Sequence, residues 1–472
     1  MWWRNAVIYE IYVRSFADSN GDGIGDLRGV ISKLDYLEWL GVDAVWLTPI
    51  MTSPGYDLGY DVSDYLAVDP TVGTMADLKV LISEADQRGI KVLLDLVANH
   101  TSIEHPWFIN PRTRRSYYVW SDQPNNWLST FHVSSWTYDD HEEKYYLHSY
   151  LPEQPDLNWR DEEVRTRFDE ILRYWFDRGV AGFRIDACYL LIKDLFLRNN
   201  PRARRDDHMW DRNRGQRPVW NANQPETHTV LRRWRRIADT YRPTRLLMGA
   251  TWVPNVEELA TYYGHGEELQ LPQYPQLLFT PFQPLALRQA VEEWLAVTPP
   301  GESPVWFGSS HDFSRFPSRW CDEDPALIRT ALTFLLTLPG ACILYQGDEI
   351  GLPDMTPSRD RMADRSGQCR DAYRSPMPWD RGPTGGFTTG QPWLPLGNVA
   401  ACNTADQMDD PGSVLHHTRW LIKQKKRLRG PYKQVALSDD CWCYQRGNTR
   451  ITLDFRPDRS KHMGLREVIT DE

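Results

Sequence analysis

The sequence predicts an α/β fold, a (β/α)8 barrel, from three observations. Short apolar runs with little polar alternation recur along the chain, which is typical of strands buried on both faces of a parallel sheet. Amphipathic helical patterns lie between them, and the strand-helix alternation repeats eight times. A chain of 472 residues is also long enough for such a barrel together with inserted or appended modules.

Eight segments are the expected strands of the barrel. In chain order they lie at residues 7–13, 42–50, 91–100, 181–187, 245–251, 269–279, 304–310 and 341–350. The sixth segment is the weakest, because Gln and Pro interrupt its apolar run.

Two of the intervening helices show clear boundaries. A helix over residues 27–40 carries its apolar side chains on one stripe and should end at Gly41. A second helix opens at Thr74, has Asp77 at the capping-box position and closes at Gly89.

The alternation is interrupted once and changes once more near the end. After the third strand lie about 60 residues rich in aromatic residues, His, Pro and Asn, and a segment of that length is functional or a small domain. Near the end, residues 441–457 alternate as strands do. The predicted divisions are a first barrel part at 1–101, an inserted subdomain B at 102–160, the barrel remainder at 161–425 and a short C-terminal β domain at 426–472.

Composition limits the class of partner. The formal net charge of -10 argues against nucleic acid, and 21 Trp and 22 Tyr provide flat faces that suit sugar rings. No signal peptide or apolar run long enough to span a membrane is evident, and no organic cofactor is expected. Seven scattered cysteines fit reduced thiols in a cytoplasmic protein. The oligomeric state stays open.

Polar residues collect at the ends of the predicted strands. In a barrel of this kind the active site is built at the C-terminal ends of the strands. A carboxylate or imidazole at one such position is more often structural, but several at one rim predict a catalytic site. These residues are Asp61, Asp95, Asn99, His100, Arg184, Asp186, His311 and Asp312.

Several motifs resemble those of a known enzyme family. "DLVANH", "GFRIDA", the "HD" after "FGSS" and "LPGACILYQGDEIG" are similar to the ordered regions of the α-amylase superfamily, glycoside hydrolase family 13. "QPDLNW", "GDGIGDL" and "RSPMPW" resemble its α-glucosidase, oligo-1,6-glucosidase and trehalose synthase branch. The resemblance runs from Trp3 to about residue 425. It implies a retaining enzyme that acts on small α-glucosides or oligosaccharides.

The resemblance assigns roles around the reacting bond. Retaining cleavage needs a carboxylate nucleophile and a carboxylic acid that protonates the leaving oxygen. Asp186 matches the nucleophile, and Arg184, on the same face of the strand, would hold it ionised. Asp312 matches the carboxylate that supports the oxocarbenium-like transition state. His100 and His311 match hydrogen-bonding partners of the sugar.

Further residues match the closed end of the sugar site. Asp61 corresponds to the residue that closes the site against the non-reducing end, and its expected partner is Arg370 near "RSPMPW". Tyr60 would be the stacking platform. A closed end implies exo-action, and Ala187 after the nucleophile accompanies α-1,4 or α,α-1,1 preference in this branch.

The general acid of the family is missing. The resemblance places a Glu after Gly249, where this chain has Ala250, and neither Thr251 nor Trp252 can donate a proton at neutral pH. Losing positioned acid-base catalysis costs about 10²- to 10⁴-fold in rate. Ser310 and the Gln-rich sixth strand also depart from the family pattern. Natural divergence and deliberate replacement at position 250 both stay open.

Three functions therefore compete. The first is an α-glucoside-processing hydrolase or transglycosylase without its acid. The second is a pseudoenzyme that binds a sugar or a protein. The third is an enzyme of altered chemistry on an activated substrate whose leaving group needs no protonation.

One loop has the composition of a metal site. "DSNGDGIGDL" places oxygen-bearing side chains at alternating positions with glycines, which suits Ca²⁺ or Mg²⁺. The resemblance favours a structural Ca²⁺, away from the chemistry. The expected ligands are Asp18, Asn20, Asp22 and Asp26.

Overall fold

The computed structural model describes residues 1–357, 361–457 and 466–467. Its centre is a sheet of eight parallel strands in the order β11-β10-β9-β5-β2-β1-β13-β12. The end strands β11 and β12 contact each other, which closes the sheet. The strands are β1 (Val7–Ile11), β2 (Ala44–Leu47), β5 (Lys91–Val97), β9 (Gly182–Asp186), β10 (Leu246–Ala250), β11 (Leu271–Gln273), β12 (Val305–Trp306) and β13 (Ala341–Tyr345). The predicted (β/α)8 barrel is confirmed, and each predicted strand segment contains one strand.

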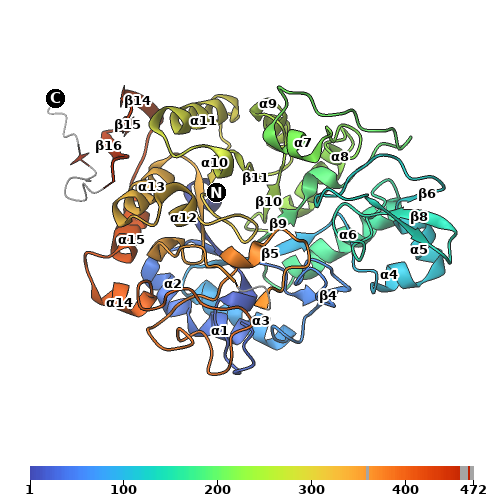
Figure 1. Ribbon diagram of the computed structural model, residues 1–472, viewed down its shortest axis with the longest axis horizontal. Helices are drawn as coiled ribbons and strands as arrows, with labels where there is room; N and C mark the ends of the chain where they lie inside the picture. Colours follow the sequence, from blue (N-terminus) through green and yellow to red (C-terminus); the bar gives the residue numbers. More distant parts are fainter. Residues whose placement is uncertain (358–360, 458–465, 468–472) are drawn as a thin grey trace.

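Helices surround the strands (Figure 1). Their apolar stripes are buried against the barrel, which explains the periodicity in the sequence. The main helices are α1 (Leu27–Ser32), α2 (Leu34–Leu40), α3 (Met75–Gln87), α6 (Glu162–Phe176), α8 (Thr227–Asp239), α11 (Pro284–Val297), α13 (Pro325–Thr337) and α15 (Val414–Lys425).

The two helices with predicted boundaries differ in outcome. The capping box of α3 is present, with the Thr74 side chain and Asp77 bonded reciprocally to backbone amides. The helix expected over residues 27–40 is wrong in its continuity, because it divides at Lys33 into α1 and α2. Its end is confirmed, since Gly41 caps α2 in the left-handed conformation, with φ 94°.

Three small modules are attached to the barrel. Between β5 and α6 lie α4 (Pro106–Ile109), α5 (Pro111–Tyr117) and a sheet of β6 (Trp120–Ser121), β8 (Lys144–Leu147) and β7 (Trp136–Asp139). After β2 comes the hairpin of β3 (Met51–Thr52) and β4 (Asp64–Val68). The C-terminal antiparallel sheet holds β14 (Tyr432–Leu437), β15 (Cys441–Arg446), β16 (Thr449–Asp454) and β17 (Arg466–Glu467). The predicted residue limits of the four domain parts stay predictions.

The remaining helical elements are short. They are α7 (Met209–Arg214), α9 (Val256–Thr261), α10 (Gln276–Phe279), α12 (Phe316–Cys321), α14 (Thr404–Asp409), and the 3-10 helices η1 (Trp2–Asn5), η2 (Val13–Ser15), η3 (Cys188–Leu190), η4 (Gly264–Gly266), η5 (Asp348–Ile350) and η7 (Arg370–Tyr373). No helix within the described part of the chain is both long and apolar enough to cross a membrane. All seven cysteines are free thiols, as expected.

Candidate active site

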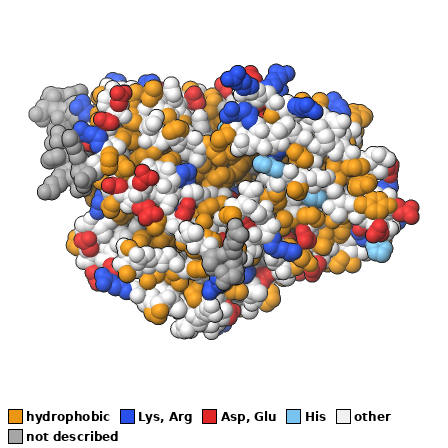
Figure 2. Space-filling model, in the orientation of Figure 1, with side chains coloured by type: hydrophobic (Ala, Val, Ile, Leu, Met, Phe, Trp, Pro, Cys, Tyr) orange, Lys and Arg blue, Asp and Glu red, His pale blue; other side chains and the backbone are white. Residues whose placement is uncertain are grey.

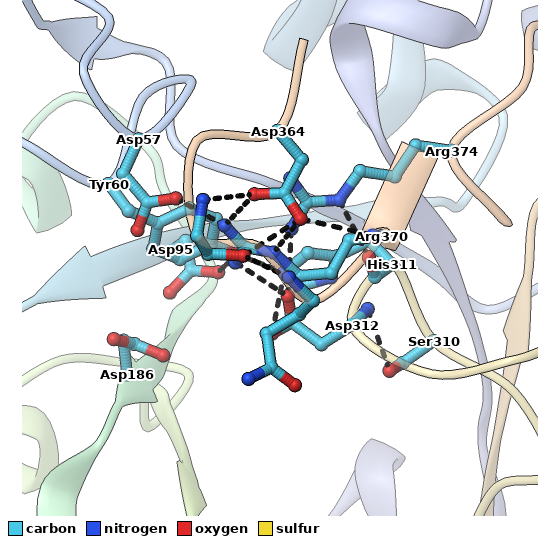
Figure 3. A network of polar contacts seen from close by, with 12 residues as sticks. Asp57, Tyr60, Asp95, Asp186, Ser310, His311, Asp312, Asp364, Arg370 and Arg374 are labelled. Carbon is cyan, nitrogen blue, oxygen red and sulfur yellow. Dashed lines mark hydrogen bonds and ion pairs between the residues drawn. The ribbon is translucent and has the colours of Figure 1, made fainter. Parts of the chain in front are cut away.

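Strand β9 ends in the pair that the sequence singled out. Because side chains of a strand alternate, Arg184 and Asp186 share one face. Arg184 Nη1 donates to Asp186 Oδ1 at 2.6 Å, and both side chains are nearly buried. A short charge-assisted bond of this kind orients the carboxylate. Figure 3 shows Asp186 at the edge of a larger polar network.

Arg184 is itself held on its other side. Its Nη1 contacts both oxygens of Asp95 at 3.2 Å, and its Nε donates to Gln273 Oε1 at 3.2 Å. Its guanidinium lies 4.9 Å from the centroid of the Trp46 ring. Burial raises the pKa of Asp95 to about 7, although the charge of Arg184 opposes that rise. The guanidinium therefore sits between two carboxylates that compete for it.

Asp312 is surrounded by positive groups. Arg374 Nη2 donates to Asp312 Oδ1 at 2.8 Å, and Arg370 Nη1 does so at 3.3 Å. The Nε2 of His311 lies 3.3 Å from Asp312 Oδ2. Burial alone would raise the pKa of Asp312, but the charges of His311, Arg370 and Arg374 outweigh it and hold that pKa below its usual range. With its side chain 34% exposed, Asp312 is an anion that a ligand can reach.

His311 is fixed between two aromatic rings. It stacks on Tyr12 and on Tyr60, with ring centroids 5.8 and 5.3 Å away. Its Nδ1 lies 2.6 Å from Glu10 Oε1, and its Nε2 lies 2.7 Å from the Tyr60 hydroxyl. That hydroxyl donates to Asp95 at 2.9 Å. Tyr60 thus has His311 against one face of its ring, and its role as a sugar platform stays a prediction.

His100 lies beside this group. Its Nε2 is 3.0 Å from the Tyr60 carbonyl oxygen and 3.1 Å from Gln154 Nε2, and its ring centroid is 5.1 Å from that of Tyr150. Asn99 Nδ2 is 3.2 Å from its other ring nitrogen. The histidine is 1% exposed, so a sugar would have to reach it through a change in these contacts.

The expected pairing of Asp61 with Arg370 is wrong. Asp61 accepts hydrogen bonds from the amides of Tyr56 and Asp57 and from the Ser53 hydroxyl, so its oxygens stabilise the loop before β4. The partner of Arg370 is Asp57, with Nη2 to Oδ1 at 2.6 Å. The physical reason is that this loop satisfies its own buried amides with Asp61 first.

Two further carboxylates hold Arg370 in place. The Asp364 carboxylate accepts hydrogen bonds from Arg370 Nε at 3.1 Å and Nη2 at 2.8 Å. Asp312 accepts a hydrogen bond from Arg370 Nη1. Figure 3 shows Asp57, Asp364 and Arg374 converging with Arg370 and Asp312. Arg370 therefore lies in the cluster and links Asp312 to the loop that carries Asp57, and its role in sugar binding stays a prediction.

Ala250 lies directly beside the Arg184–Asp186 pair. Strands β10 and β9 pair in parallel with Met248 opposite Arg184, so the next side chains on that face, Ala250 and Asp186, lie at the same level. Adjacent strands are about 4.8 Å apart, so a side chain at position 250 lies next to that of Asp186.

The backbone around position 250 is tightly packed. Cys188 Sγ donates to the Ala250 carbonyl oxygen at 3.1 Å. A Cβ on Gly249 would meet a Leu269 methyl carbon at 2.7 Å and Cys188 Sγ at 2.9 Å. A side chain at position 249 would therefore require the Leu269 and Cys188 side chains to move. Ala187, just after Asp186, has φ 44°, a conformation that side chains rarely adopt.

Sequence reasoning missed several members of the site. Glu10, Asp57, Gln273, Asp364 and Arg374 have no role in the sequence-based assignment, although each contacts a predicted residue. Arg374 is the first residue of "RSPMPW", so that motif did carry a signal. The Ser310 hydroxyl accepts a hydrogen bond from the Asp312 amide at 3.2 Å, so Ser310 caps the turn next to the site.

The oxygen-rich loop does not gather three acidic ligands. Both carboxylate oxygens of Asp18 accept hydrogen bonds from backbone amides of the loop. Asn20 Nδ2 donates a hydrogen bond to Asp22 Oδ2 at 3.1 Å. Asp26 caps α1 through the Gly29 amide and also binds Ser19. Among the described residues no group of three His, Cys, Asp or Glu side chains is placed to hold a metal ion. The oxygen donors of the loop suit Ca²⁺ chemically, and the calcium site stays a prediction.

Comparisons with known proteins agree with this geometry. Residues 10–430 match the family model described as alpha amylase, catalytic domain, so the chain belongs to the alpha-amylase family.

Relatives and solved structures extend this similarity over nearly the whole chain. A probable alpha-glucosidase of Rhizobium meliloti is 36% identical over 90% of this chain and 82% of its own length. The trehalose-6-phosphate hydrolase of Escherichia coli is 35% identical over 96% of this chain and 90% of its own length. The structure of the alpha-glucosyl transfer enzyme XgtA matches with a TM-score of 0.90 and 37% identity. The match covers 96% of this chain and 90% of that enzyme. The structure of the trehalulose synthase MutB from Pseudomonas mesoacidophila matches with a TM-score of 0.88 and 29% identity. The match covers 97% of this chain and 91% of that protein.

Proposed function

We propose that this protein processes small α-linked glucosides by a retaining mechanism, with Asp186 as nucleophile and without a positioned proton donor. The observation that carries the proposal is the Arg184–Asp186 pair, with Ala250 level with Asp186 on the adjacent strand. The relatives named alpha-glucosidase and trehalose-6-phosphate hydrolase support the substrate class, as does a MutB mutant solved in complex with sucrose. Exo-action and an α-1,4 or α,α-1,1 preference belong to the same proposal.

In the first step Asp186 attacks the anomeric carbon. Its carboxylate oxygen forms a bond to that carbon while the bond to the leaving oxygen breaks. Arg184 directs the carboxylate, since it bonds one oxygen and leaves the other available. Asp312 remains an anion through its arginines, and its charge stabilises the positive charge that develops on the sugar ring.

The residue at position 250 decides which leaving groups can depart. With Ala250 the leaving oxygen receives no proton from the protein, so it must depart as an anion. In the second step water attacks the glucosyl-enzyme, Asp186 leaves, and the proton of that water goes to solvent. Ordinary sugar leaving groups are basic alkoxides, so we expect their cleavage to be about 10²- to 10⁴-fold slower than with an acid in place.

The proposal is tested by restoring the acid. Ala250→Glu should raise kcat/KM on maltose, sucrose or trehalose by at least about 10²-fold, because position 250 lies at the height of the reacting bond. Ala250→Gln is the matched control, since it adds the same volume without the acid. If neither variant gains activity on any α-glucoside, the proposal is wrong.

A second measurement uses the unaltered protein. Azide needs no base, so it should attack a glucosyl-enzyme that water attacks slowly, and it should release α-glucosyl azide with retained configuration. Faster turnover of an activated α-glucoside with azide supports Asp186 as nucleophile. A protein that binds maltose but neither cleaves activated glucosides nor responds to azide would instead be a sugar-binding pseudoenzyme.

A further inference from the structure

A hollow lies at the end of the barrel opposite to Asp186. Its volume is about 480 Å³, which is enough for a small-molecule ligand. Its lining includes η1, which leads into β1, together with Asp43 directly before β2 and Gly340 directly before β13. The hollow is therefore built at the N-terminal ends of three neighbouring barrel strands, whereas Asp186 ends its strand. We call it the basal hollow.

Four cationic side chains line the basal hollow. They are Arg4 of η1, Lys426 and Arg429 after α15, and Arg446 at the end of β15. Asp43 in the same lining lies 3.0 Å from Lys426 Nζ through Oδ1, and its Oδ2 accepts the Val7 amide at 2.8 Å. Glu302 interacts electrostatically with Arg4 but forms no ion pair with it. Three guanidinium groups of the lining thus have no ion-pair partner among the described residues.

This local excess of positive charge is contrary to the composition of the chain. The formal net charge is -10. On the face drawn in Figure 2, Asp and Glu side chains lie among Lys and Arg side chains over much of the surface. A hollow lined by charges of one sign concentrates ions of the opposite sign. The basal hollow therefore favours an anionic ligand.

Arg446 is the most deeply buried of these cations. The residue is 5% exposed, and its guanidinium is held by the backbone. Its Nε donates to the Gly430 carbonyl oxygen at 3.0 Å, and its Nη1 donates to the Thr337 carbonyl oxygen at 2.7 Å. Both acceptors are neutral, so they fix the direction of the guanidinium without balancing its charge. A buried charge without a counterion is costly.

The charges around Arg446 add to that cost. Burial lowers the pKa of Arg446; Tyr444 opposes this decrease, whereas the charge of Arg429 adds to it. Lys425 is 1% exposed, and its Nζ donates to the Leu338 carbonyl oxygen at 3.1 Å. Burial lowers the pKa of Lys425 to about 8, and the charge of Arg446 contributes. An anion in the basal hollow would relieve the repulsion among these cations.

We propose that the basal hollow binds the diphosphate group of a small molecule through Arg4, Arg429 and Arg446. A diphosphate carries about three negative charges near neutral pH, which matches the three unpaired guanidinium groups. Guanidinium groups bind phosphate oxygens through two parallel hydrogen bonds. The inference goes beyond the proposed function, since the basal hollow and Asp186 lie at opposite ends of the barrel.

The diphosphate is either free or carried by a nucleoside, and the hollow offers a contact for the second case. Trp2 lines it as well, and this side chain is only half-buried. An indole ring provides a flat apolar face on which a nucleobase packs. A comparison of inorganic pyrophosphate with ADP therefore distinguishes the two sources.

Isothermal titration calorimetry with pyrophosphate and with ADP tests the site. The unaltered protein should bind both probes, and tighter binding of ADP would assign the site to a nucleotide. Arg4→Gln and Arg429→Gln should each weaken binding at least about tenfold, because each removes a charge-assisted hydrogen bond. Both side chains are exposed, so the melting temperature without ligand should stay unchanged in both variants.

The matched control removes an arginine elsewhere. Arg236 on α8 is exposed and lies outside the lining of the basal hollow. Arg236→Gln changes the net charge by the same amount, so it should leave both dissociation constants within about twofold at physiological salt, where charges beyond about 8 Å are screened. An equal loss of binding in this variant would show a response to overall charge and would overturn the proposal.

Two further outcomes would overturn it. One is that neither probe binds the unaltered protein at millimolar concentration. The other is that Arg4→Gln and Arg429→Gln leave the affinity unchanged. Binding needs no turnover, so Asp186→Asn should bind both probes as the unaltered protein does. The diphosphate site and the proposed function therefore stand or fall separately.

Discussion

The ion pair of Arg370 with Asp57 offers a quantitative test of the site. The pair joins the loop before β4 to η7, with 2.6 Å between Nη2 and Oδ1 and side-chain exposures of 10% and 5%. Removing one partner of such a buried pair costs about 3 to 5 kcal/mol of unfolding free energy, because the other charge stays buried. Arg370→Gln should fall in that range, whereas Asp57→Asn should cost less, because Asp364 and Asp312 still pair with Arg370.

A double-mutant cycle separates the pair from its surroundings. The double variant should be less destabilised than the sum of the single ones, with a coupling of about 1 to 3 kcal/mol from urea unfolding. The matched control is Asp61→Asn combined with Arg370→Gln. Among the described residues Asp61 bonds its own loop and not Arg370, so its coupling to Arg370 should be smaller than that of Asp57. A larger coupling for Asp61 than for Asp57 would refute this arrangement.

Three further predictions concern packing, protonation and metal. Gly249→Ala should lower the unfolding free energy by about 1 to 3 kcal/mol, since its Cβ would meet Cys188 Sγ at 2.9 Å; an unchanged urea midpoint would contradict this. Burial lowers the pKa of His105 to about 3, so the unfolded chain gains a proton near pH 6.5 that the folded chain does not. Stability should therefore fall by up to about 5 kcal/mol as pH drops from 6.5 toward 3, and His105→Gln should flatten that profile. Calcium should raise the melting temperature of the protein but not that of Asp18→Ala or Asp22→Ala; equal shifts would exclude this loop as the site.

Local patterns were sufficient for most of the scaffold. Apolar runs marked all eight barrel strands, although Gln and Pro interrupt the sixth, since both faces of a barrel strand are buried. The capping box at Thr74 was predictable because its two residues are three apart on the chain. The division at Lys33 was not, because the apolar stripe continues across it and the break lies in the backbone alone.

The choice between Asp57 and Asp61 could not be made from the sequence. The loop reads "GYDLGYD", with one Gly-Tyr-Asp triplet ending at each residue. Which carboxylate faces Arg370 depends on how the loop folds, and Leu58 and Gly59 both take positive φ values between the two. Tertiary contacts of this kind have no signature in residue spacing.

The aromatic cluster of Trp210, Trp252, Phe279 and Phe313 could not be predicted from sequence patterns either. Its four rings come from segments far apart in the chain, and an isolated aromatic residue is more often part of a core. By contrast, Arg184 and Asp186 were predictable, because alternation along one strand puts both on the same face.

Covalent labelling tests the central claim, that Asp186 remains a working nucleophile beside an absent acid. The protein is incubated with 5-fluoro-α-glucosyl fluoride, whose leaving group needs no proton, and its peptides are mapped by mass spectrometry. We predict a glucosyl adduct on the peptide that carries Asp186, and none in the Asp186→Asn variant. An adduct on another residue, or no adduct in the folded protein, would contradict the proposed mechanism.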